Sequence, residues 1–245
     1  MLEQAVIPVA APGVRQPLIE MRDVVKAYKT AAGEFIVLKK VNACIYPGEF
    51  VCIEGKSGAG KTTLINMITG VDSLSDGKVV VNGVDVHSMN EDKLALWRGL
   101  NLGVIYQSFE LMPMLTLLEN VMLPMDFCGL YHPRRSRERA IELLRLVELE
   151  SQINKLPSTI SGGQQQRVAI ARALANDPPI IVADEPTGRL DSVTAETILV
   201  FFEQLVAKGK TIIMVTHDAT AAQRADRVLS ISDGLITGEH KREEQ

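Results

Sequence analysis

The sequence lacks any apolar run that approaches the roughly 18–20 residues a membrane-spanning helix requires. If the protein works at a membrane, it therefore does so through another chain. An excess of basic residues is also lacking, since the formal net charge is −4 and the isoelectric point about 5.7. This balance argues against a protein that coats nucleic acid, and we expect no nucleic-acid partner.

Cysteine is scarce and forms no paired motif. Cys44, Cys52 and Cys128 are an odd number with no CxxC spacing, so we expect reduced thiols in the core and a cytosolic compartment. The beginning of the chain has no basic n-region and is interrupted by two prolines and a glycine, which argues against a signal peptide. We expect residues 1–17 to form a flexible tail.

The rest of the sequence alternates between strand and helix patterns. Residues 18–55 are β-rich, and Asn82–Gly83 carries the signal of a hairpin turn. "KTTLINMITG" predicts a helix that Gly70 ends. From about 108 to 160 the character becomes helical. We therefore expect an α/β domain with an antiparallel β portion near the N-terminus and a helical insertion.

Three further segments are predicted strands that end in polar residues. "IIVAD" (180–184) and "TIIMVTH" (211–217) are continuous apolar runs, typical of central strands of a parallel sheet covered on both faces. "LGVIYQ" (102–107) follows a short helix that we expect Asn90 to cap and Trp97 to end. Open α/β sheets bind ligands at the carboxyl ends of their strands, so these ends are candidate site positions.

"GKSGAGKT" follows a predicted strand and opens a predicted helix, which is the context a P-loop requires. Its glycines let the backbone wrap the β-phosphate of a nucleotide. Lys61 brings a point charge to the β- and γ-phosphates, and the Thr62 hydroxyl is a ligand for Mg²⁺. The predicted cradle consists of Gly55, Lys56, Ser57, Gly58, Ala59, Gly60, Lys61, Thr62 and Thr63.

Four polar side chains at strand ends complete this candidate site. We expect Asp184 to anchor Mg²⁺ through water, and Glu185, the next residue, to polarise an attacking water. His217 is expected to contact the γ-phosphate or that water, a purely structural role being the alternative. Gln107 is placed to reach the metal or the water.

Two further candidates have simpler alternatives. Tyr28 lies in the β-rich stretch before the P-loop, where it either stacks on adenine or is an ordinary strand tyrosine. Asp191 is a favourable helix N-cap in any case, and it is also a catalytic candidate.

A second anion-binding pattern opens a later predicted helix with Ser161, Gly162, Gly163 and Gln164. Free backbone N–H groups and the positive end of the helix dipole converge at such a start. The P-loop already provides the phosphate-binding loop that one nucleotide needs. The second pattern therefore raises the question of which nucleotide's phosphate it binds.

The motifs, taken in order, carry a family resemblance. The P-loop, the strand-end glutamine, "ISGGQQQR", "IIVADEP", "GRLD" and "VTHD" together resemble the nucleotide-binding subunit of an ABC transporter, from Leu18 to Glu239. Stretches such as "VIYQSFELMPMLTLLENVMLPM" are most similar to the lipoprotein-release, macrolide-efflux and cell-division ATPases, the LolD, MacB and FtsE group. The resemblance implies a P-loop NTPase (ABC ATPase) domain at residues 18–240, with the helical subdomain at about 108–160.

The resemblance also implies that two chains contribute residues to the same ATP site. Two domains meet head to tail, so that Ser161–Gln164 of one cap the γ-phosphate held by the P-loop of the other, and a homodimer suffices. The implied ligands are ATP and Mg²⁺, with Thr62, Gln107 and Asp184 at the metal. Hydrolysis drives a separate membrane permease, which docks near Gln107–Met125 and holds the chain at the cytoplasmic face of the inner membrane.

Several alternatives stand beside this interpretation. One is a signalling ATPase that regulates a periplasmic activity through its membrane partner. A DNA-repair or ribosome ATPase is disfavoured because the chain has no long coiled-coil insertion and no second ATPase domain. A small-molecule kinase is disfavoured by "ISGGQ" and His217. Two departures from the family pattern are Ile160, which conserves volume, and Arg189, which adds a charge near the expected dimer seam.

Two surface segments allow more than one interpretation. The methionine-rich apolar stretch 108–130 is either core or a groove for a short helix of a membrane partner. The basic run 132–139 is either a solvated helix start or a contact for anionic lipid headgroups or a permease tail.

Overall fold

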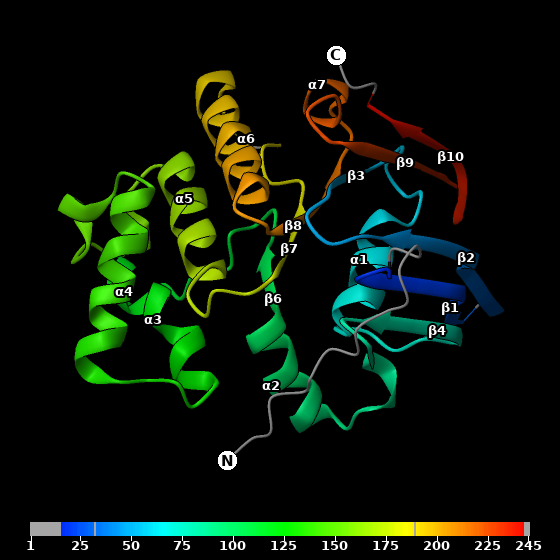
Figure 1. The fold of residues 1–245 in the computed structure, drawn as a ribbon, viewed down its shortest axis with the longest axis horizontal. Helices are drawn as coiled ribbons and strands as arrows, with labels where there is room; N and C mark the ends of the chain where they lie inside the picture. Colours follow the sequence, from blue (N-terminus) through cyan, green and yellow to red (C-terminus); the bar gives the residue numbers. More distant parts are fainter. Residues whose placement is uncertain (1–15, 32, 189, 243–245) are drawn as a thin grey trace.

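A six-stranded sheet runs through the centre of the molecule, for which the computed structural model describes residues 16–31, 33–188 and 190–242 (Figure 1). Its strands lie in the order β10–β9–β3–β8–β7–β6. Neighbouring strands are parallel, except that β10 is antiparallel to β9. The bounds are β3 Phe50–Glu54, β6 Leu102–Ile105, β7 Ile180–Asp184, β8 Thr211–Thr216, β9 Arg227–Ser232 and β10 Leu235–Lys241.

Strands β7 and β8 are central, as their continuous apolar sequences predict. Every residue of β8 is buried, and so is every residue of β7 except Asp184 at its end. Alternate side chains of β7 belong to two different hydrophobic cores, one on each face of the sheet. The carboxyl ends of β3, β6, β7 and β8 meet at one edge, because these strands are parallel.

A second sheet is antiparallel and has the order β2–β1–β4–β5. Its strands are β1 Ile19–Thr30, β2 Gly33–Ile45, β4 Asp76–Val81 and β5 Val84–Asp85. The predicted hairpin is confirmed: Asn82 and Gly83, with φ of 51° and 76°, form the two-residue turn between β4 and β5. Helix α1 (Lys61–Thr69) shares one core with this sheet and the central sheet.

The helix after the P-loop ends where the sequence predicts, but the next helix does not. Gly70 caps α1 with a φ of 64°. Helix α2 (Glu91–Asn101) is capped by Asn90 as expected, yet it continues four residues past Trp97, and β6 ends at Ile105. Gln107 therefore lies two residues beyond its strand, which corrects the predicted boundary.

Three helices between β6 and β7 form the helical part of the molecule. They are α3 Leu117–Phe127, α4 Pro133–Leu146 and α5 Gly162–Ala173, with one-turn helices η2 Glu150–Gln152 and η3 Pro157–Thr159. Figure 1 shows α3, α4 and α5 grouped on the side of the molecule away from the antiparallel sheet. The basic run forms the start of α4, with His132 as its N-cap.

The apolar stretch 108–130 serves both the core and the surface. Met125 is buried and Met122 packs against the core, whereas Met112 and Met114 are exposed. The remaining helices are η1 Val86–Ser88, α6 Ser192–Ala207 and α7 Ala219–Ala222. Within the described ranges, no helix is both long and apolar enough to cross a bilayer. Arg189 and most of the predicted tail, residues 1–15, lie outside those ranges.

Candidate active site

The P-loop joins the end of β3 to the start of α1. Gly55 passes so close to β9 that a Cβ there would lie 2.4 Å from the carbonyl oxygen of Ile231. Gly60 has a φ of 104° and precedes α1 without any side-chain cap. The first N–H groups of α1 are therefore left for an anion, as the sequence predicts for a phosphate cradle.

Lys61, the first residue of α1, lies beneath this loop. Its ammonium donates hydrogen bonds to the carbonyl oxygens of Gly55 (2.8 Å) and Lys56 (3.0 Å), and the residue is only 8% exposed. Two carbonyls thus hold the charge at the base of the loop, where incoming phosphate oxygens would meet it.

A cavity of about 590 Å³ opens beside the P-loop. It brings together P-loop residues and the three predicted residues that follow β6, β7 and β8, although these lie far apart in the sequence. Its lining residues are Phe35, Val37, Ser57, Gly58, Gly60, Lys61, Thr62, Thr63, Gln107, Asp184, Glu185 and His217. This size suits a nucleotide's phosphates and sugar.

Thr62 and Asp184 face each other across this cavity. The Thr62 hydroxyl donates a hydrogen bond of 3.0 Å to an Asp184 carboxylate oxygen. Burial raises the pKa of Asp184, and the hydrogen bond from Thr62 offsets part of that effect. A hydroxyl and a partly desolvated carboxylate at this spacing are the hard oxygen donors that Mg²⁺ prefers, so the donor set fits the predicted metal.

Glu185 and His217 form a pair at the ends of β7 and β8. The imidazole Nδ1 of His217 lies 2.8 Å from a carboxylate oxygen of Glu185. The other carboxylate oxygen, Oε2, is buried and has no hydrogen-bond partner among the described residues. Glu185 also has a left-handed φ of 49°, a conformation that costs free energy in a non-glycine residue. A carboxylate so constrained, in a residue that lines the cavity and with one oxygen that has no hydrogen-bond partner, is suited to accept a proton.

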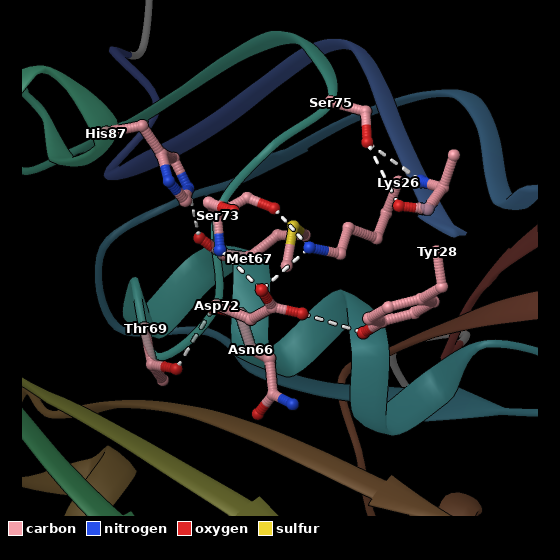
Figure 2. Close-up of polar contacts among 10 residues, drawn as sticks. Lys26, Tyr28, Asn66, Met67, Thr69, Asp72, Ser73, Ser75 and His87 are labelled. Atoms are coloured by element: carbon pink, nitrogen blue, oxygen red, sulfur yellow. Dashed lines mark hydrogen bonds and ion pairs between the residues drawn. The ribbon is translucent and has the colours of Figure 1, made fainter. Parts of the chain in front are cut away.

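Tyr28 does not line the cavity, and neither do Gly55, Lys56 and Ala59 of the predicted cradle. As Figure 2 shows, the Tyr28 hydroxyl donates a 2.7 Å hydrogen bond to Asp72, in the turn after α1. The Lys26 ammonium lies 4.7 Å from the centre of the Tyr28 ring. The aromatic residue that lines the cavity is Phe35, directly opposite Tyr28 on β2.

Sequence reasoning missed Phe35 and Val37. Both lie in β2, where alternate residues share one face of the strand. The signal available was the pairing of β1 with β2, which puts Phe35 on the same face as Tyr28. Without the register, no residue of β2 stands out.

The second anion-binding pattern forms a helix start away from the cavity. Ser161 is exposed and N-caps α5, accepting a hydrogen bond from the Gln164 backbone (3.3 Å), while the Gln164 side chain accepts one from the Ser161 backbone (3.0 Å). None of Ser161, Gly162, Gly163 and Gln164 lines the P-loop cavity. Their hypothesised phosphate contact is therefore not made within this cavity of the single chain.

Asp191 is the N-cap of α6, as predicted. Its two carboxylate oxygens accept hydrogen bonds from the backbone N–H (3.0 Å) and the hydroxyl (2.7 Å) of Thr194. It does not line the cavity either. Gly163 lies nearby, since a Cβ on it would be 3.2 Å from Thr194, so the two helix starts are neighbours.

A glycine-rich loop between a strand and a helix, with acidic residues at the same edge of the sheet, where β7 ends, defines a P-loop nucleoside triphosphatase. The sequence profile of the ABC transporter family matches residues 38–188, and the chain belongs to that family. The family, the fold class and ATP binding were predicted from the sequence, and all three are confirmed.

Relatives in two arrangements are similar to this chain. The ABC transporter ATP-binding protein MJ0796 of Methanocaldococcus jannaschii is 44% identical over 91% of this chain and 97% of its own length. The macrolide export ATP-binding/permease protein MacB of Pasteurella multocida is 42% identical over 91% of this chain, which spans 34% of that longer protein. The chain thus corresponds to a complete ATP-binding protein in the first case and to one part of a larger protein in the second.

Solved structures agree with the fold. A dimeric structure of MJ0796 superposes with a TM-score of 0.88 at 43% identity, covering 93% of this chain and all of that one. A dimeric post-hydrolysis state of MJ0796 bound to ADP and Pi gives a TM-score of 0.87 at 42% identity, with the same coverage. This chain is accordingly the ATP-binding subunit of an ABC transporter, and its activity is ATP hydrolysis.

Proposed function

We propose that two copies of this chain pair head to tail and hydrolyse two ATP molecules at sites that both copies build. What supports a shared site is the separation of two anion-binding features in one chain. The P-loop lines the cavity, while Ser161 and its neighbours are exposed on another helix start. The relative MJ0796 has been solved as a dimer, which is the arrangement that would bring the two features together.

The metal site that we propose consists of Thr62, Gln107 and Asp184, with Mg²⁺ as the ion. All three line the cavity, and the hydroxyl of Thr62 already meets the carboxylate of Asp184. Bound there, Mg²⁺ would neutralise charge on the phosphate oxygens. Gln107 contributes an amide oxygen, which is an acceptable ligand for a hard cation or for its water.

In the proposed mechanism Glu185 accepts a proton from the attacking water. His217 holds the Glu185 carboxylate by the 2.8 Å contact and contacts the γ-phosphate or the water from the exposed side of the cavity. Lys61 stabilises negative charge on the phosphate, and Ser161 and Gly163 of the second copy close the opposite side. Asp191, which caps a helix beside Gly163, acts at the seam between the copies.

The permease site that we propose is a groove of about 660 Å³ between α2, β6, α3 and α5. Its lining includes the apolar residues Leu96, Met112 and Phe127, of which Phe127 is 78% exposed. A short amphipathic helix fits such a surface. The groove overlaps the predicted Gln107–Met125 region and extends it to α2. Docking there would hold the chain peripherally at the cytoplasmic face of the inner membrane.

We further propose that the permease exports its substrate. The relatives named as macrolide export proteins carry an ATP-binding part that matches nine-tenths of this chain. In a signalling ATPase, by contrast, the same hydrolysis would regulate a periplasmic activity without any transported molecule.

The substitution Glu185→Gln tests the assigned chemistry. The amide keeps the size and the hydrogen-bonding geometry but accepts protons poorly, so we expect ATP to bind and turnover to fall by roughly 10²–10⁴-fold. The variant should accumulate as an ATP-bound dimer, measurable by sedimentation. Hydrolysis by this variant at a near-normal rate would refute the role of Glu185.

A further inference from the structure

The loop that follows Gln107 has a strained backbone. Phe109 and Glu110 are consecutive non-glycine residues with left-handed φ angles of 61° and 49°. Such a backbone conformation is unfavourable for a non-glycine residue and persists only where the surroundings hold it. Two short backbone hydrogen bonds, from Phe109 to Tyr106 (3.2 Å) and from Glu110 to Ser108 (2.7 Å), tighten the loop, but both lie within it. They leave open what fixes the loop to the rest of the molecule.

Two side chains from other elements supply that connection. Buried Asn120 of α3 accepts a hydrogen bond from the Met112 N–H (2.7 Å) and donates one to the Met112 carbonyl (3.1 Å), which fixes the far end of the loop. Arg172, near the end of α5, donates hydrogen bonds to the carbonyl oxygens of Phe109 (2.7 Å) and Glu110. The two bonds start from the two terminal nitrogens of one guanidinium, whose planar fork fixes both carbonyls at once. Among the described residues Arg172 forms no ion pair, and its side-chain hydrogen bonds go to these two carbonyls. Burial lowers the pKa of Arg172, in keeping with a cation enclosed by protein.

The position of Arg172 joins three regions of the molecule. Helix α5 begins at the Ser161 cap and packs against α3 and β6. Arg172 and Glu110 both line the α2–α3–α5 groove, while Gln107, three residues before Glu110, lines the ATP cavity. Arg172 thus connects the groove and the helix that carries Ser161 to a loop whose first residue, Gln107, lines the ATP cavity.

We propose that Arg172 is a positioning residue that fastens the Gln107 loop to helix α5, so that Gln107 and the Ser161 helix start move together. The inference rests on the proposed function, because it gives Gln107 a role at the metal or the water and Ser161 a role on the second copy's ATP. Loss of Arg172 should then slow turnover at an unchanged affinity of the P-loop for nucleotide, since no P-loop contact involves this residue.

Two variants of Arg172 and one matched control test the link. Arg172→Met keeps the length of the side chain and removes both hydrogen bonds, while Arg172→Lys restores a charge that reaches one carbonyl. Arg139→Met is the control, because Arg139 also donates to a backbone carbonyl of this region, that of Leu174 (3.3 Å), but touches neither the loop nor the groove.

Three quantities are compared: kcat for ATP, the Kd for the nonhydrolysable analogue AMP-PNP, and amide hydrogen exchange of residues 108–112. For Arg172→Met we expect kcat to fall at least tenfold, Kd to stay within twofold, and exchange to speed up at least tenfold. Arg172→Lys should lie between that variant and the wild type, and Arg139→Met should stay within twofold throughout. Either a wild-type kcat or a wild-type exchange rate in Arg172→Met would overturn the proposal. If that variant does not fold, a wild-type kcat in Arg172→Lys would do so.

Gln107→Ala, measured in parallel, separates failure of this link from failure of the proposed function. If Gln107→Ala lowers kcat and Arg172→Met leaves it unchanged, the link is wrong and the role of Gln107 stands. If Gln107→Ala has no effect, the role of Gln107 is wrong, and the exchange of residues 108–112 in Arg172→Met still decides whether Arg172 fastens the loop.

Discussion

Among single residues, Asp72 links the antiparallel sheet to the end of the P-loop helix by hydrogen bonds. Its carboxylate accepts hydrogen bonds from Lys26 and Tyr28 of β1, each 2.7 Å long, and Figure 2 shows all three side chains converging at the end of α1. Burial alone would raise the pKa of Asp72, but these hydrogen bonds outweigh it and leave the pKa below the ordinary value of 3.8. The carboxylate is therefore favoured in the folded protein.

The substitution Asp72→Asn should lower the free energy of unfolding by about 1–2 kcal/mol at pH 7, the usual contribution of a hydrogen-bonded charged group. The folded pKa lies below the unfolded value, so this contribution is complete above about pH 4 and disappears as the pH falls through the folded pKa. Urea unfolding of both proteins at pH 7 and near pH 2.5 measures the difference. An equal deficit at the two pH values would show that the carboxylate's charge is not responsible.

Site residues were predictable where a short motif fixes both backbone and chemistry. Gly60 adopts a positive φ, and Lys61 lies at the base of the loop. Both features could be predicted because the two residues belong to one short continuous motif. Phe35 was not predictable in this way, because it lines the cavity only through the register of β2 against β1. The position of Tyr28 likewise depends on Asp72, 44 residues away.

At the scale of elements, two neighbouring helix starts form the proposed second half of the site. The caps of α5 and α6 are Ser161 and Asp191, and each bonds the backbone three residues on. The cap at Asp191 was predicted from sequence, because capping is local, and so was the helix start at Gly162, whereas the cap by Ser161 was not. Whether Asp191 does more than cap α6 is a separate question, which a substitution that preserves the cap answers.

Asp191→Ser is that substitution. Serine caps helices about as well as aspartate, so we expect the free energy of unfolding to change by less than about 0.5 kcal/mol, whereas Asp191→Ala should cost about 1 kcal/mol. If Asp191 also acts in catalysis, as we propose, the serine variant should lose turnover despite its wild-type stability. Thermal unfolding and ATPase assays on the same samples measure both. Full activity of Asp191→Ser would leave it a helix cap alone.

The ends of elements that depend on distant contacts were predicted less well. Helix α2 continues past Trp97 because its last turn is held from outside: Arg98 donates to the Gly70 carbonyl (2.9 Å) and Asn176 donates to the Gly99 carbonyl (2.8 Å). Neither partner is close in the sequence. Burial within the methionine-rich stretch 108–130 was also not predictable from local sequence, because the apolar residue types alone did not distinguish buried Met125 from exposed Met112.

For the whole molecule, local sequence patterns predicted the order of strands and helices along the chain, whereas the sharing of a site by two copies was predicted only through the family resemblance. The order follows from local patterns, and the parallel sheet follows from the continuous apolar strands. The distance between the P-loop cavity and the Ser161 helix start is a property of the complete fold. It is this separation that makes a second copy the natural source of the missing contacts.

The most direct test of the shared site is the ATPase activity per chain as a function of protein concentration. If both copies build each site, activity per chain should rise in proportion to protein concentration while most chains are monomeric. It should level off at concentrations where sedimentation shows dimers. Activity per chain that stays constant, at its full value, across concentrations where sedimentation shows only monomers would contradict the account.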